Sequence, residues 1–167
     1  IVMLALTPIA PHAAISFGLD PSAIGYQISL IFFFGIFGSA TSGLMVARFG
    51  AVRVEQFVLL ALSAGLLAIA TANLFFAIFG SCLIGISYGM QNPVSSQILG
   101  RFSPHHRRNM LFSIKQAGMP TGGVIASLLI PLLDDRIGWQ WGFVGIALVP
   151  LLMIVLVNSH APEFPRR

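Results

Sequence analysis

The fold is decided by a short stretch that joins two long apolar runs: Gly43-Leu44-Met45-Val46-Ala47-Arg48-Phe49-Gly50-Ala51-Val52-Arg53. The run before it, Ile24–Val46, and the run after it, Phe57–Leu99, contain no charged residue. The stretch itself carries two glycines, two arginines and no acid. Short basic connections between long apolar runs are typical of the cytoplasmic loops of membrane proteins. This stretch therefore indicates which side of a membrane the rest of the chain faces.

The composition also indicates a membrane protein. Of 167 residues, 56% are hydrophobic and only 8% are charged, whereas a soluble domain carries about 25% charged residues. Because so few charges cannot cover a globule with a wetted surface, we expect an integral protein of the lipid bilayer. The net charge of +4 does not indicate nucleic-acid binding, since the basic residues form short clusters between apolar runs. The single cysteine, Cys82, can build neither a disulfide nor a cysteine metal site, and we expect no cofactor.

A spanning helix needs about 20 mostly apolar residues. The apolar runs predict an all-α membrane protein with six transmembrane helices, at about 1–17, 23–47, 54–72, 74–102, 110–133 and 139–157. We expect the first helix to be truncated, because the chain opens on Ile1 inside an apolar run and without the charged start of a signal peptide.

The loops alternate in charge along the chain. The connections after the second and fourth expected helices and the C-terminal tail hold these basic residues: Arg48, Arg53, Arg101, Arg107, Arg108, Arg166 and Arg167. The opposite side holds only Arg136, beside two aspartates. The positive-inside rule then places the opening stretch and the C-terminus in the cytoplasm, in a bacterial-type inner (plasma) membrane.

Small residues recur at helical spacing in the expected second, fourth and fifth helices, for example at Gly35 and Gly38 and at Gly85 and Gly89. Such residues let membrane helices approach closely. The pattern fits tight static packing, and it also fits helices that slide or rock against each other. The third expected helix has fewer small residues, which predicts a lipid-facing position. Tryptophans 139 and 141 are expected in the aromatic belt at the outer membrane surface.

The opening stretch, Gly43-x-x-x-Ala47-Arg48-x-Gly50-x-x-Arg53, resembles the loop signature of the major facilitator superfamily, Gly-x-x-x-Asp-Arg-x-Gly-x-basic-basic. Three later stretches resemble the family's fourth helix, its passage from helix four to helix five, and the start of its sixth helix. They are Gly85–Gly89 with Asn92-Pro93, Arg107-Arg108 with Gly118–Gly123, and Ile137–Phe143. The resemblance covers essentially the whole chain, as an N-terminal six-helix half.

The resemblance implies a secondary transporter of a small solute, anionic or polar organic, and not an enzyme. The full protein would have twelve helices in two halves that rock about a central cavity, so the missing C-terminal half is an expected partner, and a coupling ion such as a proton is another. Ala47 stands where the signature has its aspartate, which predicts a weaker cytoplasmic gate. Ser81 stands where proton-coupled members often have an arginine, which argues against proton antiport through this half.

Lys115 is the only charged residue well inside an expected span, about 10 Å along the helix from Arg108. An intramembrane cation costs about 3 kcal/mol and is by default a functional candidate. Gln116 follows it, and Gln91 and Asn92 lie at similar depth on the preceding antiparallel helix. These four residues form the predicted substrate-binding layer, in which Lys115 would help to select anions. The alternatives are that Lys115 extends to the headgroups and that the amides only bond between helices.

The predicted gating loop consists of Gly43, Arg48, Gly50 and Arg53. Its arginines would contact acids or the negative ends of helices in the other half. Alternatively, they only fix the orientation of the chain.

The residues leave two other functions as alternatives. A channel or a non-transporting receptor stays as the alternative, although a channel would favour a ring of like charges or a repeated pore loop, and neither is present in this sequence. Gly85–Gly89 also matches the Gly-x-Ser-x-Gly motif of serine hydrolases. That chemistry needs a base for Ser87 and a strand before it, whereas the later histidines fall outside the spans and the motif lies on an expected membrane helix.

Overall fold

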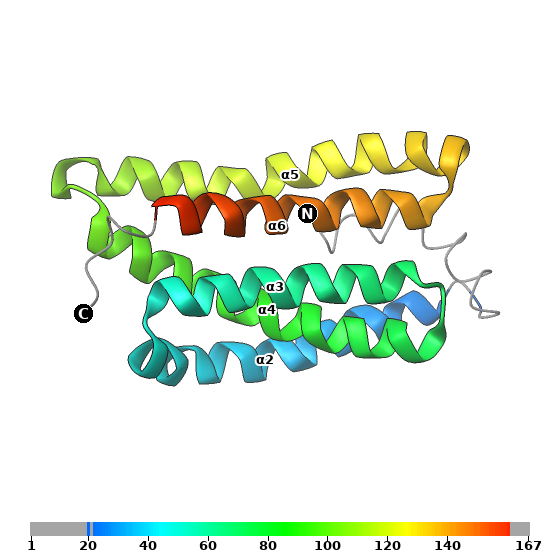
Figure 1. Cartoon of the computed structure of the whole chain (residues 1–167), viewed down its shortest axis with the longest axis horizontal. Coiled ribbons are helices and arrows are strands. Elements are labelled where there is room, and N and C mark those ends of the chain that lie inside the picture. Colours follow the sequence, from blue (N-terminus) through cyan, green and yellow to red (C-terminus); the bar gives the residue numbers. More distant parts are fainter. Residues whose placement is uncertain (1–19, 21, 161–167) are drawn as a thin grey trace.

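The computed structural model describes Asp20 and residues 22–160, and Figure 1 shows their arrangement. Within this part the long elements are α2 (Ala23–Phe49), α3 (Ala51–Ala70), α4 (Leu74–Phe102), α5 (Arg108–Ile137) and α6 (Trp139–His160), with a short 3-10 turn, η1 (His105–Arg107), before α5. The described residues contain no strand. The first expected helix, at about 1–17, lies outside the described residues.

Two of the expected connections are shorter than the sequence suggested. The turn between α2 and α3 is Gly50 alone, because α2 continues through Phe49 and α3 begins at Ala51. The polar segment before α6 is likewise helical as far as Ile137, which leaves Gly138 as the link. Both linking glycines have positive φ, 81° and 89°, a backbone conformation that residues with a side chain rarely adopt. One such glycine lets two helices follow each other directly, and this is why the expected loop residues joined the helices.

Four helices in the described part are long and apolar enough to cross a membrane: α2, α3, α4 and α6. The fifth, α5, is less apolar than these and is not among them in the described residues. The chain is therefore a helical membrane protein with four candidate spans in the part that the structure describes.

The helices pack in a continuous order in which α4 is shared by two partners. It lies against both α2 and α3, α3 lies against α6 on its other side, and α6 lies beside α5 (Figure 1). Phe57, Leu60 and Leu67 are exposed on one face of α3, so the expected lipid-facing position of the third helix stays a prediction. Val58, Leu66 and Ile69 of α3 are buried between its neighbours. A single glycine, Gly65, is enough to bring α3 against α4.

Glycines make the closest approaches between these helices. A Cβ atom on Gly89 of α4 would overlap the carbonyl oxygen of Gly35 of α2, and one on Gly85 would lie 2.5 Å from the carbonyl oxygen of Ile31. Between α3 and α4, a Cβ on Gly80 would lie 2.5 Å from the carbonyl oxygen of Gly65. Here these contacts are called the glycine seam. The seam confirms the expected close approach of helices through small residues.

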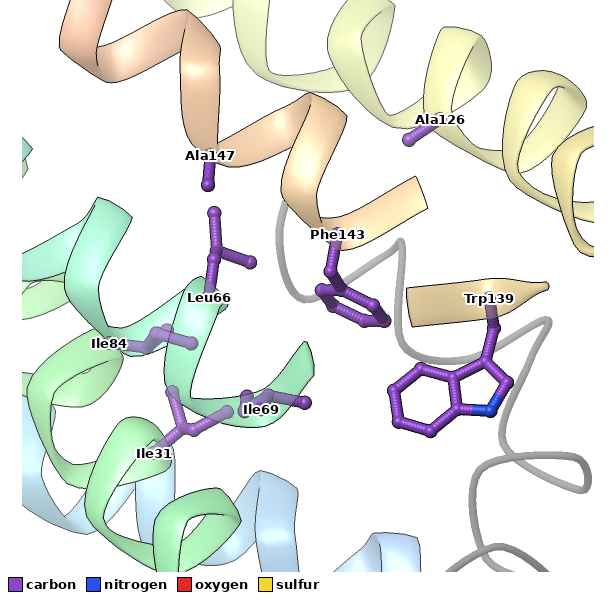
Figure 2. Close-up of a cluster of buried hydrophobic side chains, with 8 residues drawn as sticks. All are labelled: Ile31, Leu66, Ile69, Ile84, Ala126, Trp139, Phe143 and Ala147. Atoms are coloured by element: carbon purple, nitrogen blue, oxygen red, sulfur yellow. The ribbon is translucent and has the colours of Figure 1, made fainter. Parts of the chain in front are cut away.

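The main core lies where α3, α4 and α6 meet, with contributions from α2 and α5. Figure 2 shows its members: Ile31, Leu66, Ile69, Ile84, Ala126, Trp139, Phe143 and Ala147. Trp139 meets Phe143 edge to face, with 5.8 Å between the ring centroids, and is only 4% exposed. Trp139 is therefore a core residue, contrary to the aromatic-belt expectation, whereas Trp141 is 63% exposed. The two side chains differ because residues two apart on a helix point to nearly opposite sides.

Candidate functional site

Polar side chains from α3, α4 and α5 meet on the second part of α4. Figure 1 shows that this part of α4 runs from α3 towards the start of α5. This polar cluster consists of Glu55 of α3, Gln91, Asn92 and Ser96 of α4, and Lys115 of α5. It lies in the half of α4 that follows the glycine seam. Helices α3, α4 and α5 thus place hydrogen-bonding groups together at one level.

Glu55 is the acid of this cluster, and among the described residues only one of its two carboxylate oxygens has a hydrogen-bond donor. The Nε2 amide of Gln91 donates to Oε1 of Glu55 over 2.8 Å. The other carboxylate oxygen, Oε2, is buried and has no hydrogen-bond partner among the described residues. The neighbouring side chains of Val54, Val58 and Met90 belong to an apolar cluster between α3 and α4. Burying an ionised carboxylate with an open acceptor in such surroundings is costly, so a group with this geometry is a candidate for function.

Lys115 reaches across to α4. Its Nζ donates to Oγ of Ser96 over 2.9 Å and to the backbone carbonyl of Asn92 over 3.3 Å. The ammonium also lies 6.0 Å from the centroid of the Phe112 ring. The structure therefore places this half-buried cation on the flank of α4 rather than beyond the end of α5.

The structure brings together three of the four residues of the predicted substrate-binding layer. The side chain of Gln91 donates to Glu55, and the side chain of Lys115 donates to the backbone carbonyl of Asn92. Gln116 is exposed on α5 and forms no hydrogen bond with the cluster in the part of the chain that the structure describes. Whether these residues bind a solute stays a prediction.

Two members of the cluster were missed from the sequence, Glu55 and Ser96. Because α3 begins at Ala51, Glu55 lies a full turn inside the helix, while Arg53 is exposed. The signal that could have found Glu55 is that it is the last acid before an uncharged run of more than forty residues. Ser96 gave no signal of its own, since serine is common in these helices.

The predicted gating loop is spread over two helices and their link. Gly43 lies inside α2 with open space where a Cβ would stand. Arg48 lies in the last turn of α2 and Arg53 in the first turn of α3, on either side of Gly50. In the part of the chain that the structure describes, both arginines are exposed and neither forms a hydrogen bond or an ion pair. This geometry fits a topological anchor and also fits contacts to another part of the protein.

A groove of about 290 Å³ runs between α2 and α4 beside the cluster. It is lined by Phe32, Gly35, Ile36, Ser39, Tyr88, Gly89, Asn92 and Pro93. Phe32 and Tyr88 meet edge to face at 6.0 Å. Proline has no backbone N–H, so Pro93 leaves the carbonyl of Gly89 without its helical donor. Asn92 lines the groove, and its backbone carbonyl accepts from Lys115 of the polar cluster; the other members of the cluster do not line the groove.

Two further observations limit the chemistry of this region. Ser81 is fully buried, accepts from Nε2 of Gln27 over 3.0 Å and donates to the carbonyl of Ala77, so it joins α4 to α2. Among the described residues, no three histidine, cysteine, aspartate or glutamate side chains come together as metal ligands would.

Comparison with known proteins agrees with the membrane architecture. The family model of the Major Facilitator Superfamily matches residues 1–166. The 4-hydroxybenzoate transporter PcaK of Acinetobacter baylyi is 31% identical over 160 residues, which cover 93% of this chain and 34% of that protein. The glucose transporter GlcP of Staphylococcus epidermidis is 28% identical over 150 residues, which cover 89% of this chain and 33% of that protein. The plastidic glucose transporter 4 of Arabidopsis thaliana is 28% identical over 145 residues, covering 85% and 26%.

The chain spans about a third of the length of the curated relatives it matches. No solved structure matches it significantly. The family match extends over nearly every residue, and the basic turn, the glycine-lined α4 and the apolar helices all lie within it. This chain therefore belongs to the major facilitator superfamily.

Proposed function

We propose that this chain is the N-terminal six-helix half of a twelve-helix secondary transporter, which carries a small solute across the membrane by alternating access. The family match and the transporter names of its relatives support a carrier rather than an enzyme. Those relatives are named for glucose and for 4-hydroxybenzoate, so a polar organic solute is the class that we assign here. The remaining half of the same protein would complete the solute cavity.

The observation that carries the proposal is the polar cluster. A partly buried acid and a lysine lie between helices whose spans are otherwise almost uncharged. Ionisable groups at such positions are expensive, and they mark solute or ion pathways in membrane proteins. In the proposal, Lys115, Gln91 and Asn92 contribute hydrogen bonds to the solute from this half. Gln116 lies on the exposed face of α5, where the second half would reach it.

The exposed arginines give the proposed orientation. With Arg48, Arg53 and the α4–α5 connection on the cytoplasmic side, the chain follows the positive-inside rule in an inner or plasma membrane. Arg48 and Arg53 would then contact the other half in one state of the transport cycle. Their exposure and lack of partners in the described residues support this role.

Counterflow by the full-length protein in proteoliposomes tests the proposal. Vesicles are loaded with unlabelled glucose or 4-hydroxybenzoate, and uptake of the same labelled compound is followed at increasing external concentration. A carrier gives saturable uptake that internal solute accelerates. A channel gives uptake that rises linearly and shows no counterflow, and this result with both compounds would contradict the proposal.

A further inference from the structure

The groove between α2 and α4 has a floor made by two glycines of the glycine seam. Gly35 of α2 lies so close to Gly89 of α4 that a Cβ atom on Gly89 would overlap the carbonyl oxygen of Gly35. Because neither residue has a side chain, a hollow of about 290 Å³ remains above this contact. Ligand pockets in proteins measure about 300–1,000 Å³. The groove therefore has the size of a site for one small solute.

Two aromatic side chains line one end of this groove. The glycine contacts advance together along both helices, so α2 and α4 run in the same direction. Phe32 and Tyr88, which come first on their helices among the lining residues, lie at the same end with 6.0 Å between their ring centroids. Phe32 is 50% exposed and Tyr88 is 39% exposed, so part of each ring is free to contact a solute. From Phe32 to Ser39 the groove follows α2 for about 10 Å, which suits one six-membered ring with its substituents.

Polar groups without hydrogen-bond partners line the groove as well. The side-chain amide of Asn92 and the hydroxyls of Ser39 and Tyr88 form no hydrogen bond among the described residues. Ser39 and Asn92 are both exposed. The carbonyl of Gly89 lacks its usual helical donor because Pro93 has no backbone N–H. Donors and acceptors thus stay available beside the two rings.

These polar groups argue against a lipid tail as the occupant of the groove. A hydrocarbon chain would offer no donor or acceptor to Asn92, to Ser39 or to the carbonyl of Gly89. Unsatisfied polar groups are costly in the interior of a membrane. An occupant that both contacts rings and exchanges hydrogen bonds fits the lining better, and a small polar solute has this chemistry.

The groove opens on the side of α4 that α5 approaches. Tyr88, Asn92 and Ser96 follow each other at every fourth position and share one face of α4. Lys115 of α5 donates to Ser96 and to the backbone carbonyl of Asn92. Met90, which belongs to the apolar cluster with side chains of α3, lies two residues from Tyr88 and points to nearly the opposite side. A solute in the groove would therefore lie on the same side of α4 as Lys115 and away from α3.

We propose that this groove is a subsite for a single six-membered ring that carries a hydroxyl group. The ring would lie against Phe32 and Tyr88, whose exposed faces contact its C–H groups or its own aromatic face. The hydroxyl would exchange hydrogen bonds with the amide of Asn92, which offers both a donor and an acceptor, and with the hydroxyl of Ser39. This inference rests on the proposed transport function and names the solute class.

Uptake kinetics of the full-length protein in proteoliposomes test both kinds of contact. Glucose and 4-hydroxybenzoate are the probes, since the first is a saturated ring and the second an aromatic ring, and both carry hydroxyls. Phe32→Leu removes a ring and Asn92→Ala removes the amide. For the probe that the wild type carries, each variant should raise KM by about tenfold while kcat stays close to that of the wild type, because a binding contact is lost. Phe33→Leu and Gln97→Ala are matched controls at exposed positions outside the groove, and they should leave KM unchanged.

Thiol labelling tests whether the groove is open and whether the solute occupies it. In a full-length background without other cysteines, in which Cys82 is replaced by serine, Ser39→Cys places a thiol in the groove. A water-soluble maleimide should label this thiol, and the transported probe should slow the labelling. Ala40→Cys places an exposed thiol on the next residue, outside the groove, and the probe should leave its labelling rate unchanged. Protection by glucose would identify a saturated ring, and protection by 4-hydroxybenzoate an aromatic one.

The outcomes separate the inference from the function. If Phe32→Leu or Asn92→Ala behaves like its control, or if neither probe protects Ser39→Cys, while uptake and counterflow persist, the inference is overturned and the carrier function stands. A Ser39→Cys thiol that is never labelled would mean that lipid or another part of the protein fills the groove, and this also overturns the inference. If the wild type shows no saturable uptake or counterflow with either probe, the proposed function fails, and the inference fails with it.

Discussion

The helix α4 is held in two different ways along its length. In its first part it meets α2 and α3 through the glycine seam, where backbone lies directly on backbone. In its second part it meets α5 through two long cationic side chains. Lys115 donates to Ser96 and to the Asn92 carbonyl, and Arg108 donates to the carbonyl of Gly100.

The difference shows which contacts of α4 can break without movement of a helix backbone. Nothing can be added to the glycine seam without displacing a helix backbone, so α2, α3 and α4 are expected to move as one unit. The contacts with α5 depend on side chains whose rotamers can change while both helices keep their backbone. A solute that competes for the Lys115 ammonium would therefore loosen α5 from α4 without disturbing the seam.

The largest effect is expected from filling the seam. Gly89→Leu would place a side chain between the backbones of α4 and α2, and we expect the full-length protein to lose its folded state. Overpacking a core commonly costs about 1–3 kcal/mol, and here the backbone itself would have to move. Size-exclusion profiles and thermal unfolding in detergent measure the loss. Gly43→Leu is the matched control, because Gly43 lies on α2 with open space around it and should tolerate the change.

The second effect concerns the core that joins α6 to α3. Trp139→Ala removes a buried ring that packs on Phe143, and we expect a loss of about 3 kcal/mol in the free energy of unfolding. Trp141→Ala removes an exposed ring two residues away and should cost far less. Equal losses for the two variants in unfolding titrations would mean that Trp139 lies at the membrane surface after all.

A smaller effect is expected where the polar cluster is broken on the α4 side. Gln91→Leu removes the donor to Oε1 of Glu55, and we expect a loss of about 2 kcal/mol because a hydrogen bond to a charged group is lost. Gln56→Leu removes the exposed bond to Asn158 between α3 and α6, worth about 0.6 kcal/mol as a neutral pair in a membrane. The same unfolding titration compares both, and an equal cost for the two would contradict the buried charge.

The smallest effect lies outside both regions, at the start of α2. The backbone N–H of Ser22 donates to Oδ1 of Asp20 over 2.9 Å and, with the Ser22 hydroxyl, lowers the pKa of Asp20 below its usual 3.8. Because the folded pKa is the lower one, this contact stabilises the helix start above pH 3.8 and is lost as the pH falls through the folded value. Asp20→Ala should therefore speed hydrogen exchange in the first turn of α2 near neutral pH. A difference from the wild type that persists well below that range would count against the contact.

Much of this architecture follows from local patterns in the sequence. The bounds of α4 agree with the expected range of 74–102, since a long uncharged run between Asn73 and the basic connection leaves little choice. The glycine spacing predicted the seam, because a missing Cβ has one simple use between membrane helices. The positions of Gln91, Asn92 and Lys115 at one level followed from counting residues along two antiparallel helices.

The positions of Glu55 and Trp139 depended on details that counting residues along the helices does not reveal. The one-residue link at Gly50 shifted the start of α3 by nearly a turn, and this shift turned Glu55 from a surface acid into a member of the cluster. The link at Gly138 set the angle at which α6 begins and sent Trp139 into the core. Both errors came from the length of a turn, because a glycine with positive φ can replace a loop of several residues.

Distances between spin labels test the central comparison most directly. In the full-length protein, one label on Gln97 of α4 is paired either with a label on Ser113 of α5 or with one on Ala40 of α2, all exposed positions. Each pair is measured by pulsed electron paramagnetic resonance in the wild type and in Lys115→Met. The distance distribution across α4 and α5 should broaden in the variant, while the distribution across α4 and α2 stays the same. An unchanged distribution across α4 and α5 would contradict the conclusion that the Lys115 contact holds α5 in place.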